Sequence, residues 1–402
     1  MAAEEAPWRR RFTAPRVRLP RWARDAPGRC LYASDEPGRW ELYSWDVAGD
    51  ARVQLTDRPE GTTAGAVDPA GAWTWWFADE AGGEFGRWMR QPFGAGPGQA
   101  TPLGLPPAYS AGLALGSEVA VVASASDAGT SVHVVRHPLD HRLLYSHPEP
   151  AWLGELSRDD SLVCIAHSEH GDSLHPALRV MSLEGAGVSD LWDGPGLGLD
   201  PGPWSPVPGD RRMIVGHERA DRARFGLWAP VSGEFQDFPV PELPGDVAAT
   251  WYPDGAALLV VHRRGARATL HRLELESGGL RPLATEPGWV EAAAVRPDGA
   301  LWMDWSSGAD PPRVLSGGAP LLVPPGPPPP GGVPYRELRM GQVHALVAEP
   351  PAPPPHPGVF LIHGGPQAQD ADAFSPKDQA WVDHGFAVVH VNYRGSAGYG
   401  RA

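Results

Sequence analysis

The sequence has few cysteines, no long apolar run and no excess of basic residues, and each of these absences excludes a class of protein. Of its 402 residues, 2 are cysteines, Cys30 and Cys164. They lie far apart inside apolar runs, so the sequence predicts two buried thiols and neither a disulfide framework nor a thiolate metal site. The longest apolar runs have about five to seven residues, and about 20 are needed to cross a bilayer. We therefore expect no membrane-spanning segment, no membrane partner and a cytoplasmic protein.

The charge balance is acidic, with 34 Lys and Arg against 48 Asp and Glu and a formal net charge of −14. Phosphate backbones repel such a protein, so we expect no nucleic acid partner. Glycine and proline are abundant, at 49 and 47 residues. This content breaks helices and favours many turns between short strands, which excludes an all-helical fold.

A turn followed directly by an apolar strand recurs along most of the chain. The spacings between successive turns are 43, 45, 44, 49, 46 and 44 residues. Each interval has room for four short strands, which is the period and content of a β-propeller blade. The sequence therefore predicts seven blades, and a β-sandwich with chance regularity is the alternative. The turn residues are Gly28, Gly71, Gly116, Asp160, Gly209, Gly255 and Gly299.

The repeat ends at the Pro-rich stretch VPPGPPPPGG, residues 323–332. Such a run prefers extended polyproline conformation and cannot join a central strand, so we interpret it as a spacer between two domains. A ligand for a proline-recognising module is the alternative. Beyond it, the continuous apolar runs at 359–362 and 386–391 are typical of strands buried on both faces of a parallel α/β sheet. A helix is expected near 377–384.

Two motifs follow these apolar strands: HGGP at 363–366, and NYRGS at 392–396 with GYG at 398–400. Placed after a propeller, they resemble the prolyl oligopeptidase family of serine peptidases, especially its acylaminoacyl peptidase and dipeptidyl aminopeptidase-like branches. The resemblance implies a mostly β protein, a seven-bladed propeller followed by the incomplete start of an α/β-hydrolase domain. The expected division is an N-terminal extension and closing strand (1–27), the propeller (28–322), the linker (323–332) and the hydrolase part (333–402).

The resemblance also implies a reaction. Members of the family hydrolyse short peptides through an acyl-enzyme, with a Ser nucleophile, a His base and an orienting Asp, with no metal or organic cofactor, and with the propeller filtering substrates by size. Acyl transfer needs N–H donors for an oxyanion, and in α/β-hydrolases one donor follows the third strand. By resemblance, the Gly365 N–H is that donor. The residues expected to shape the site are His363, Gly364, Pro366, Asn392, Tyr393, Arg394 and Gly395.

The nucleophile, Asp and His are not expected within this sequence. No G-x-S-x-G occurs in the 402 residues, and the family places all three after this point, so we expect them beyond Ala402 and an inactive chain when it is alone. Without the strand that carries the nucleophile, residues 359–362 are expected at a sheet edge. Ser396 has Arg394 where the nucleophile elbow needs glycine, so Ser396 is interpreted as a loop residue that fixes the backbone.

Several alternatives stay open. The G-x-x-G-x-G order of residues 395–400 could suggest a dinucleotide loop, but that fingerprint runs G-x-G-x-x-G and continues into a helix. His137, His141 and His147 could suggest a metal site, but solvated or edge histidines explain them better. The rival functions are a non-catalytic propeller that binds a partner, with the tail as a remnant, and an esterase of the same fold. Neither the peptide preference nor the oligomeric state can be predicted from the sequence.

Overall fold

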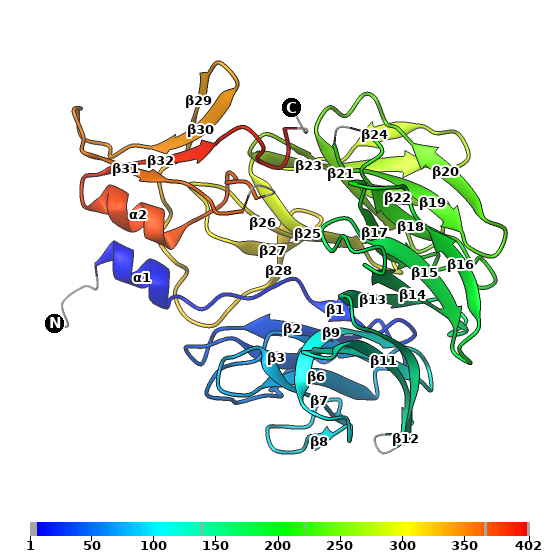
Figure 1. The fold of residues 1–402 in the computed structure, drawn as a ribbon. Helices are drawn as coiled ribbons and strands as arrows, with labels where there is room; N and C mark the ends of the chain where they lie inside the picture. The colour runs from blue at the N-terminus through cyan, green and yellow to red at the C-terminus, as the bar shows by residue number, and fades with distance from the viewer. Residues whose placement is uncertain (1–5, 138–139, 221, 366–367, 400–402) are drawn as a thin grey trace.

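The structure is a computed structural model that describes residues 6–137, 140–220, 222–365 and 368–399. It is mostly β, as predicted: strands β1 to β28 follow one another as antiparallel meanders, and the tail forms a separate sheet (Figure 1). The described helices are α1 (Pro7–Thr13) and α2 (Pro376–Asp383). Neither has the length and apolar character that crossing a membrane requires.

The meanders occupy residues 21–322. The first sheet contains β1 (Arg21–Trp22), β2 (Arg29–Ser34), β3 (Glu41–Asp46) and β4 (Ala51–Gln54). An eight-stranded sheet contains β5 (Gly65–Val67), β6 (Trp73–Asp79), β7 (Phe85–Pro92), β8 (Thr101–Pro102), β9 (Ala108–Leu115), β10 (Ala120–Ser126), β11 (Gly129–His137) and β12 (Asp140–His147). Within it, β7 pairs with β9 and so joins two meanders. Because of this joined sheet, the count of seven blades stays a prediction.

Four further four-stranded sheets follow in chain order. The first pair contains β13 (Ala151–Leu156), β14 (Leu162–His167), β15 (Ala177–Ser182) and β16 (Gly187–Leu191), then β17 (Leu199–Trp204), β18 (Met213–His217), β19 (Arg224–Ala229) and β20 (Glu234–Phe238). The second pair contains β21 (Asp246–Trp251), β22 (Ala257–Arg264), β23 (Arg267–Glu274) and β24 (Leu280–Pro282), then β25 (Trp289–Val295), β26 (Leu301–Ser306), β27 (Arg313–Ser316) and β28 (Ala319–Leu322).

Adjacent meanders pack through apolar clusters, and one of these clusters joins the first sheet to the last. In it, Cys30 and Trp45 of the first sheet pack with Trp302 and Leu322 of the last. Arg296 adds a hydrogen bond to the Pro27 carbonyl at 2.9 Å, and its guanidinium lies 4.1 Å from the centre of the Trp302 ring. The ring of sheets therefore closes through side-chain packing, in which the first and last sheets cover each other.

Both thiols are fully buried and free, as predicted. Cys30 belongs to the cluster that closes the ring, and Cys164 lies between the sheets that begin at β13 and β17. Burial raises the pKa of Cys30 to about 11, even though the nearby Arg296 acts in the opposite direction. Burial also raises the pKa of Cys164. Neither thiol is therefore suited to ligate a metal or to act as a nucleophile.

The tail sheet has the order β29 (Arg336–Met340), β30 (Val343–Ala348), β32 (Ala387–Asn392) and β31 (Gly358–Leu361), with α2 between β31 and β32 in the chain. β31 and β32 run parallel. The expected edge is present, because β31 pairs only with β32 among the described residues. The prediction of burial on both faces is wrong for β31: at this edge, Phe360 and Ile362 are each 67% exposed.

The N-terminal residues differ from the expected extension with a closing strand. β1 pairs with β2 and so opens the first sheet, and it makes no strand pairing with the last sheet. The turn at Gly28 joins these two strands, which is why the meander begins before the turn. Helix α1 lies against α2 of the tail, where Arg11 forms an ion pair with Asp383 (Figure 1).

Candidate functional site

The two motif loops leave the same edge of the tail sheet. Leu361 lies opposite His390 in the parallel β31–β32 pair, so the residues that follow each strand emerge side by side. The rings of His363 and Tyr393 stack with their centroids 4.6 Å apart, and the Tyr393 hydroxyl donates to the His363 carbonyl at 3.1 Å. The structure therefore brings together the HGG and NYRG residues that the sequence singled out.

Ser396 is a loop-fixing residue in this arrangement. Its side chain is buried, with 1% of the residue exposed. Its hydroxyl donates to the Tyr393 carbonyl at 2.7 Å, and the His363 Nε2 lies 2.9 Å from the same Oγ. Because the single hydroxyl proton goes to the carbonyl, His363 must donate to Ser396. A nucleophilic serine would instead donate to its base, so this pair stabilises the loop.

The glycines of the first motif are open to solvent. Gly365 has a φ of +64°, the left-handed region that favours glycine. No heavy atom lies within 4 Å of the position where a Cβ on Gly364 or Gly365 would stand. The Gly365 N–H has no acceptor among the described residues. Arg394 and Gly395 are also exposed, and Pro366 lies outside the described residues.

The Asn392 side chain links the two segments that follow the HGGP and NYRGS motifs. It is buried, and its amide nitrogen donates to the Asp370 carbonyl at 2.9 Å and to the Tyr399 hydroxyl at 3.0 Å. Its side-chain oxygen accepts the Asp370 N–H at 2.8 Å. All these partners belong to the tail, so Asn392 positions the surrounding chain and leaves no polar atom of its amide for a ligand.

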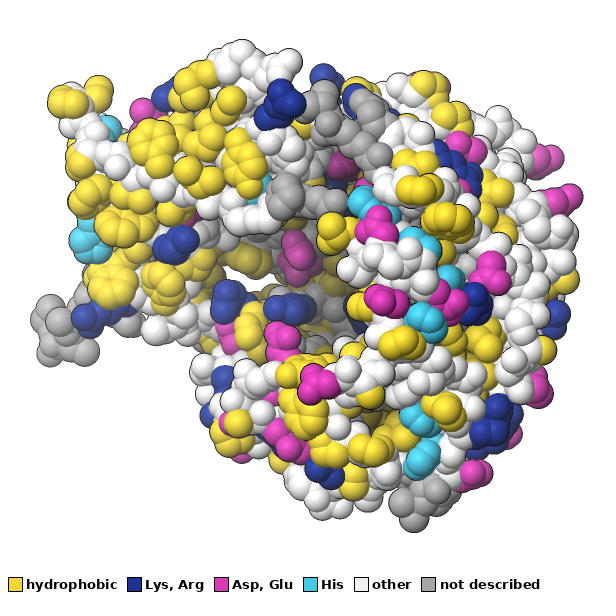
Figure 2. Space-filling view, in the orientation of Figure 1, with side chains coloured by type: hydrophobic (Ala, Val, Ile, Leu, Met, Phe, Trp, Pro, Cys, Tyr) yellow, Lys and Arg dark blue, Asp and Glu magenta, His cyan; other side chains and the backbone are white. Residues whose placement is uncertain are grey.

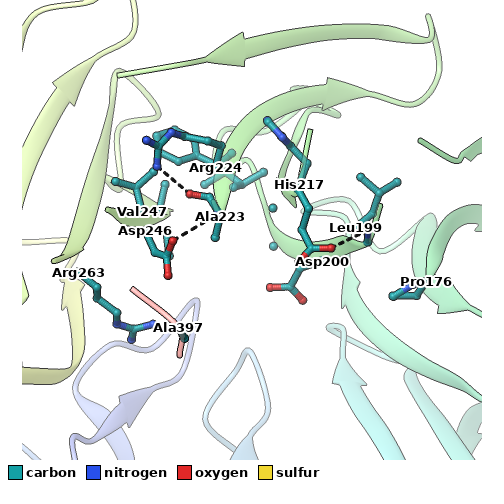
Figure 3. Close-up of a pocket in the computed structure, with 18 of the residues that line it drawn as sticks. Pro176, Leu199, Asp200, His217, Ala223, Arg224, Asp246, Val247, Arg263 and Ala397 are labelled. Atoms are coloured by element: carbon teal, nitrogen blue, oxygen red, sulfur yellow. Dashed lines mark hydrogen bonds between the residues drawn. The ribbon is translucent and has the colours of Figure 1, made fainter. Parts of the chain in front are cut away.

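A cavity of about 450 Å³ lies where the innermost strands β17 and β21 face the tail. The tail contributes Gln369 and Ala397, and the latter follows the NYRGS motif directly (Figure 3). Asp246 accepts hydrogen bonds from the Gly398 N–H at 2.6 Å and the Ala223 N–H at 3.3 Å, which links the propeller to the tail beside the cavity. No described residue of the HGGP motif lines it.

Asp200 and Arg263 supply charge to the same cavity (Figure 3). Burial raises the pKa of Asp200. The Arg263 side chain lies over the Trp289 ring at 5.2 Å, and its Nε has no partner in the described chain. Sequence reasoning missed both residues, because they stand on ordinary propeller strands that carry no motif. Only their place on strands that face the tail distinguishes them.

The histidines considered as metal ligands do not assemble. His141 pairs with Val135 and His147 with Thr130, at opposite ends of the β11–β12 ladder. The side chain of His137 lies outside the described part of the chain. Among the residues described, no group of three His, Cys, Asp or Glu side chains could hold a metal ion.

No family model matches the chain. An alignment over 189 positions, which covers 40% of this chain, is 30% identical to dipeptidyl-peptidase 5 of Aspergillus fumigatus and covers 26% of that protein. Another, of 47 residues or 12% of the chain, is 45% identical to dipeptidyl aminopeptidase BIII of Pseudoxanthomonas mexicana and covers 7% of it. A prolyl endopeptidase structure superposes on 98% of this chain and 64% of its own, with a TM-score of 0.80 at 14% identity.

The chain resembles the prolyl oligopeptidase family in segments of its sequence and in its overall fold. The acylaminoacyl peptidase of Pyrococcus horikoshii has the same fold, with a TM-score of 0.72 at 12% identity over 99% of this chain and 68% of that one. The match spans about a quarter of the length of the Aspergillus relative and about two thirds of the solved chains.

Proposed function

We propose that these 402 residues form the propeller and the oxyanion side of the peptidase domain of a serine peptidase that acts on short peptides. The observation that carries the proposal is the cavity that β17 and β21 share with the loop after the NYRGS motif. It lies between the two parts of the chain and borders a motif of the family. The names of the relatives, dipeptidyl peptidases, give it further support.

The reaction we propose is acyl transfer to a serine. The Gly365 N–H is proposed as an oxyanion donor, supported by its exposure, its left-handed backbone and the absence of an acceptor among the described residues. His363, stacked on Tyr393 and bonded to Ser396, would hold the loop in place. The nucleophile, Asp and His are proposed to lie outside the 402 residues, in keeping with the absence of G-x-S-x-G from them.

The size of the cavity supports peptides as substrates. Pockets of roughly 300–1,000 Å³ bury ligands of a few hundred daltons, and this one measures about 450 Å³. It would accommodate a few residues of an extended peptide and exclude a folded domain. The propeller would then act as a size filter in front of the site.

The test compares the 402-residue chain with the product of any reading frame that continues past codon 402. The 402-residue chain should not label with a fluorophosphonate and should not hydrolyse chromogenic aminoacyl or acyl-aminoacyl amides. A longer product containing G-x-S-x-G should do both. Stoichiometric labelling of the 402-residue chain would contradict the placement of the nucleophile. A longer product that cleaves esters and no amides would favour the esterase, and a stop codon after 402 would favour the binding module.

A further inference from the structure

A buried cluster in the tail places a histidine, which the proposed reaction does not use, between two carboxylates. His390 stands on β32, and its Nε2 lies 2.7 Å from an oxygen of Asp378 on α2. Its Nδ1 lies 3.3 Å from an oxygen of Asp370. The Tyr335 hydroxyl donates to the same Asp378 oxygen at 2.5 Å. Asp378 is 1% exposed, so this is an internal group of charges.

Both ring nitrogens of His390 face carboxylate oxygens, which only accept hydrogen bonds, so the arrangement favours a proton on each nitrogen. Burial alone would lower the pKa of His390, but the carboxylates of Asp370 and Asp378 raise it to about 9. Burial likewise acts to raise the pKa of Asp378, and the bonds from His390 and Tyr335 lower it. Asp370, Asp378 and Tyr335 are the titratable groups that face the His390 ring from the surrounding elements.

The Asp370 carboxylate has fewer other contacts than the Asp378 carboxylate, so its position depends more on the charge of His390. The facing atoms, Asp370 Oδ2 and His390 Nδ1, lie 3.3 Å apart, and both are buried without a hydrogen-bond partner in the described chain. Asp378 keeps the Tyr335 hydroxyl, and its N–H donates to the Ser375 side chain at the start of α2. Loss of the His390 charge would therefore release the Asp370 side chain first.

Asp370 lies in a segment, residues 369–372, that joins the tail to the propeller. Asp372 accepts from the Gly308 N–H at 2.9 Å and the Arg267 Nε at 3.0 Å, and its own N–H donates to the Ala266 carbonyl at 2.7 Å. Gln369 lines the cavity. With its amide turned to satisfy both groups, Gln369 donates to the Ala397 carbonyl at 2.6 Å and the Gly265 carbonyl at 3.2 Å.

We propose that His390, as an imidazolium, is the positioning residue for segment 369–372. It holds the Asp370 carboxylate inside the tail, where Asn392 bonds the Asp370 main chain, while the residues on either side contact the propeller. It thereby fixes the position of the tail against the propeller and the side of the cavity that the tail forms. When His390 loses its proton, a lone pair faces a carboxylate, attraction is replaced by repulsion, and the segment loosens. This inference goes beyond the proposed function, because it requires no peptide hydrolysis.

Hydrogen exchange on the whole 402-residue chain tests the inference. Between pH 7 and pH 10, with intrinsic exchange rates corrected for pH, the protection of amides 369–373 should fall at least about tenfold. The midpoint of this fall should lie near pH 9, where His390 loses its proton. His390→Gln should exchange rapidly at every pH. His384→Gln, at an exposed histidine just after α2, should keep the wild-type profile.

If His390→Gln fails to fold, Asp370→Asn provides the same test, because it leaves the His390–Asp378 contact in place. It should expose amides 369–373 at pH 7 and abolish their pH dependence. A purely structural ion pair would change overall stability without this local alkaline step. Uniform protection of the segment from pH 7 to pH 10 in the wild type, or a wild-type profile in the folded variants, would overturn the proposal.

Discussion

Arg11 and Asp383 form an ion pair at 2.5 Å that fastens helix α1, near the start of the chain, to helix α2 of the tail. The same guanidinium donates to the Gly331 carbonyl at 2.7 Å, at the end of the Pro-rich linker. One buried side chain therefore connects the N-terminal residues, the linker and the tail. Together with the contacts of segment 369–372, it holds the tail at two separate places.

Replacing Arg11 should loosen the tail. In Arg11→Met, the Asp383 carboxylate and the Gly331 carbonyl lose their donor, and we expect a loss of about 2–3 kcal/mol in the free energy of unfolding, because hydrogen bonds to charged groups contribute about 1.5–3 kcal/mol. Denaturant titration followed by tryptophan fluorescence measures this loss. The neighbouring Arg9 is exposed, and Arg9→Met should change the midpoint little. Equal effects of the two substitutions would show that the ion pair is not the cause.

The stability of the chain should decline in alkali because of His390. Its folded-state pKa of about 9 lies above the ordinary value of 6.5, so its contribution is complete below about pH 6.5 and disappears as the pH rises through 9. The full contribution is about 3 kcal/mol, from 1.36 kcal/mol per pKa unit. Urea titrations at pH 6.5, 8 and 10 should show the decline in the wild type and a flatter dependence in His390→Gln. A steeper decline in the variant would contradict this assignment.

Removing the tail should improve solubility. Phe360 of the edge strand β31 and Ile362, just after its end, are exposed, and Figure 2 shows further apolar side chains gathered over the tail. Unpaired apolar edges promote association. Deletion from Gly331 onward should raise soluble yield and leave a cooperative all-β transition by circular dichroism, because the ring closes through residues of the first and last sheets. In the full chain, Ile362→Lys should raise the yield with the tail retained.

Two results would contradict this account of the tail. One is loss of the propeller transition when residues from Gly331 are deleted, which would make the tail part of the propeller's own stability. The other is strong hydrogen-exchange protection of amides 359–363 in a demonstrated monomer, which would require a partner for the β31 edge.

The two thiols should report on the closure of the ring. Both are fully buried, so neither should react with a thiol reagent at pH 8 in the native chain. Arg296 bonds the Pro27 carbonyl beside Cys30. In Arg296→Met, Cys30 should react at least about tenfold faster while Cys164 stays protected, because local opening of a few kcal/mol changes exposure by such factors. Peptide mass mapping separates the two sites. Equal acceleration at both would indicate global unfolding.

The features that the sequence predicted are those that depend on local pattern. Turn glycines such as Gly255 and Gly299 and the strands that follow them recur at the spacing that the sheets require. The helix expected near 377–384 is α2, Pro376–Asp383, which has Ser375 as its N-cap. Each of these needs only short-range information.

The features that the sequence missed depend on contacts between distant residues. The pairing of β7 with β9 joins two predicted units and leaves no trace in either pattern. His390 sits in an apolar run, and its partners Asp370 and Asp378 meet it only because α2 folds back on β32. Asp200 reads as an ordinary strand residue until the tail covers that face of the propeller. Pattern analysis cannot supply such contacts, because they arise from tertiary packing.

The ring closure also sets an order of events during synthesis. Cys30 and its partner Arg296 are 266 residues apart. At about 5–20 residues per second, the ribosome needs roughly 15 to 50 s to make the chain between them. Throughout that time, the aromatic face of the first sheet, with Tyr43 and Trp45, has no partner sheet. The nascent chain therefore presents this face to the cell before it can close, and chaperone capture at the first sheet is the expected consequence.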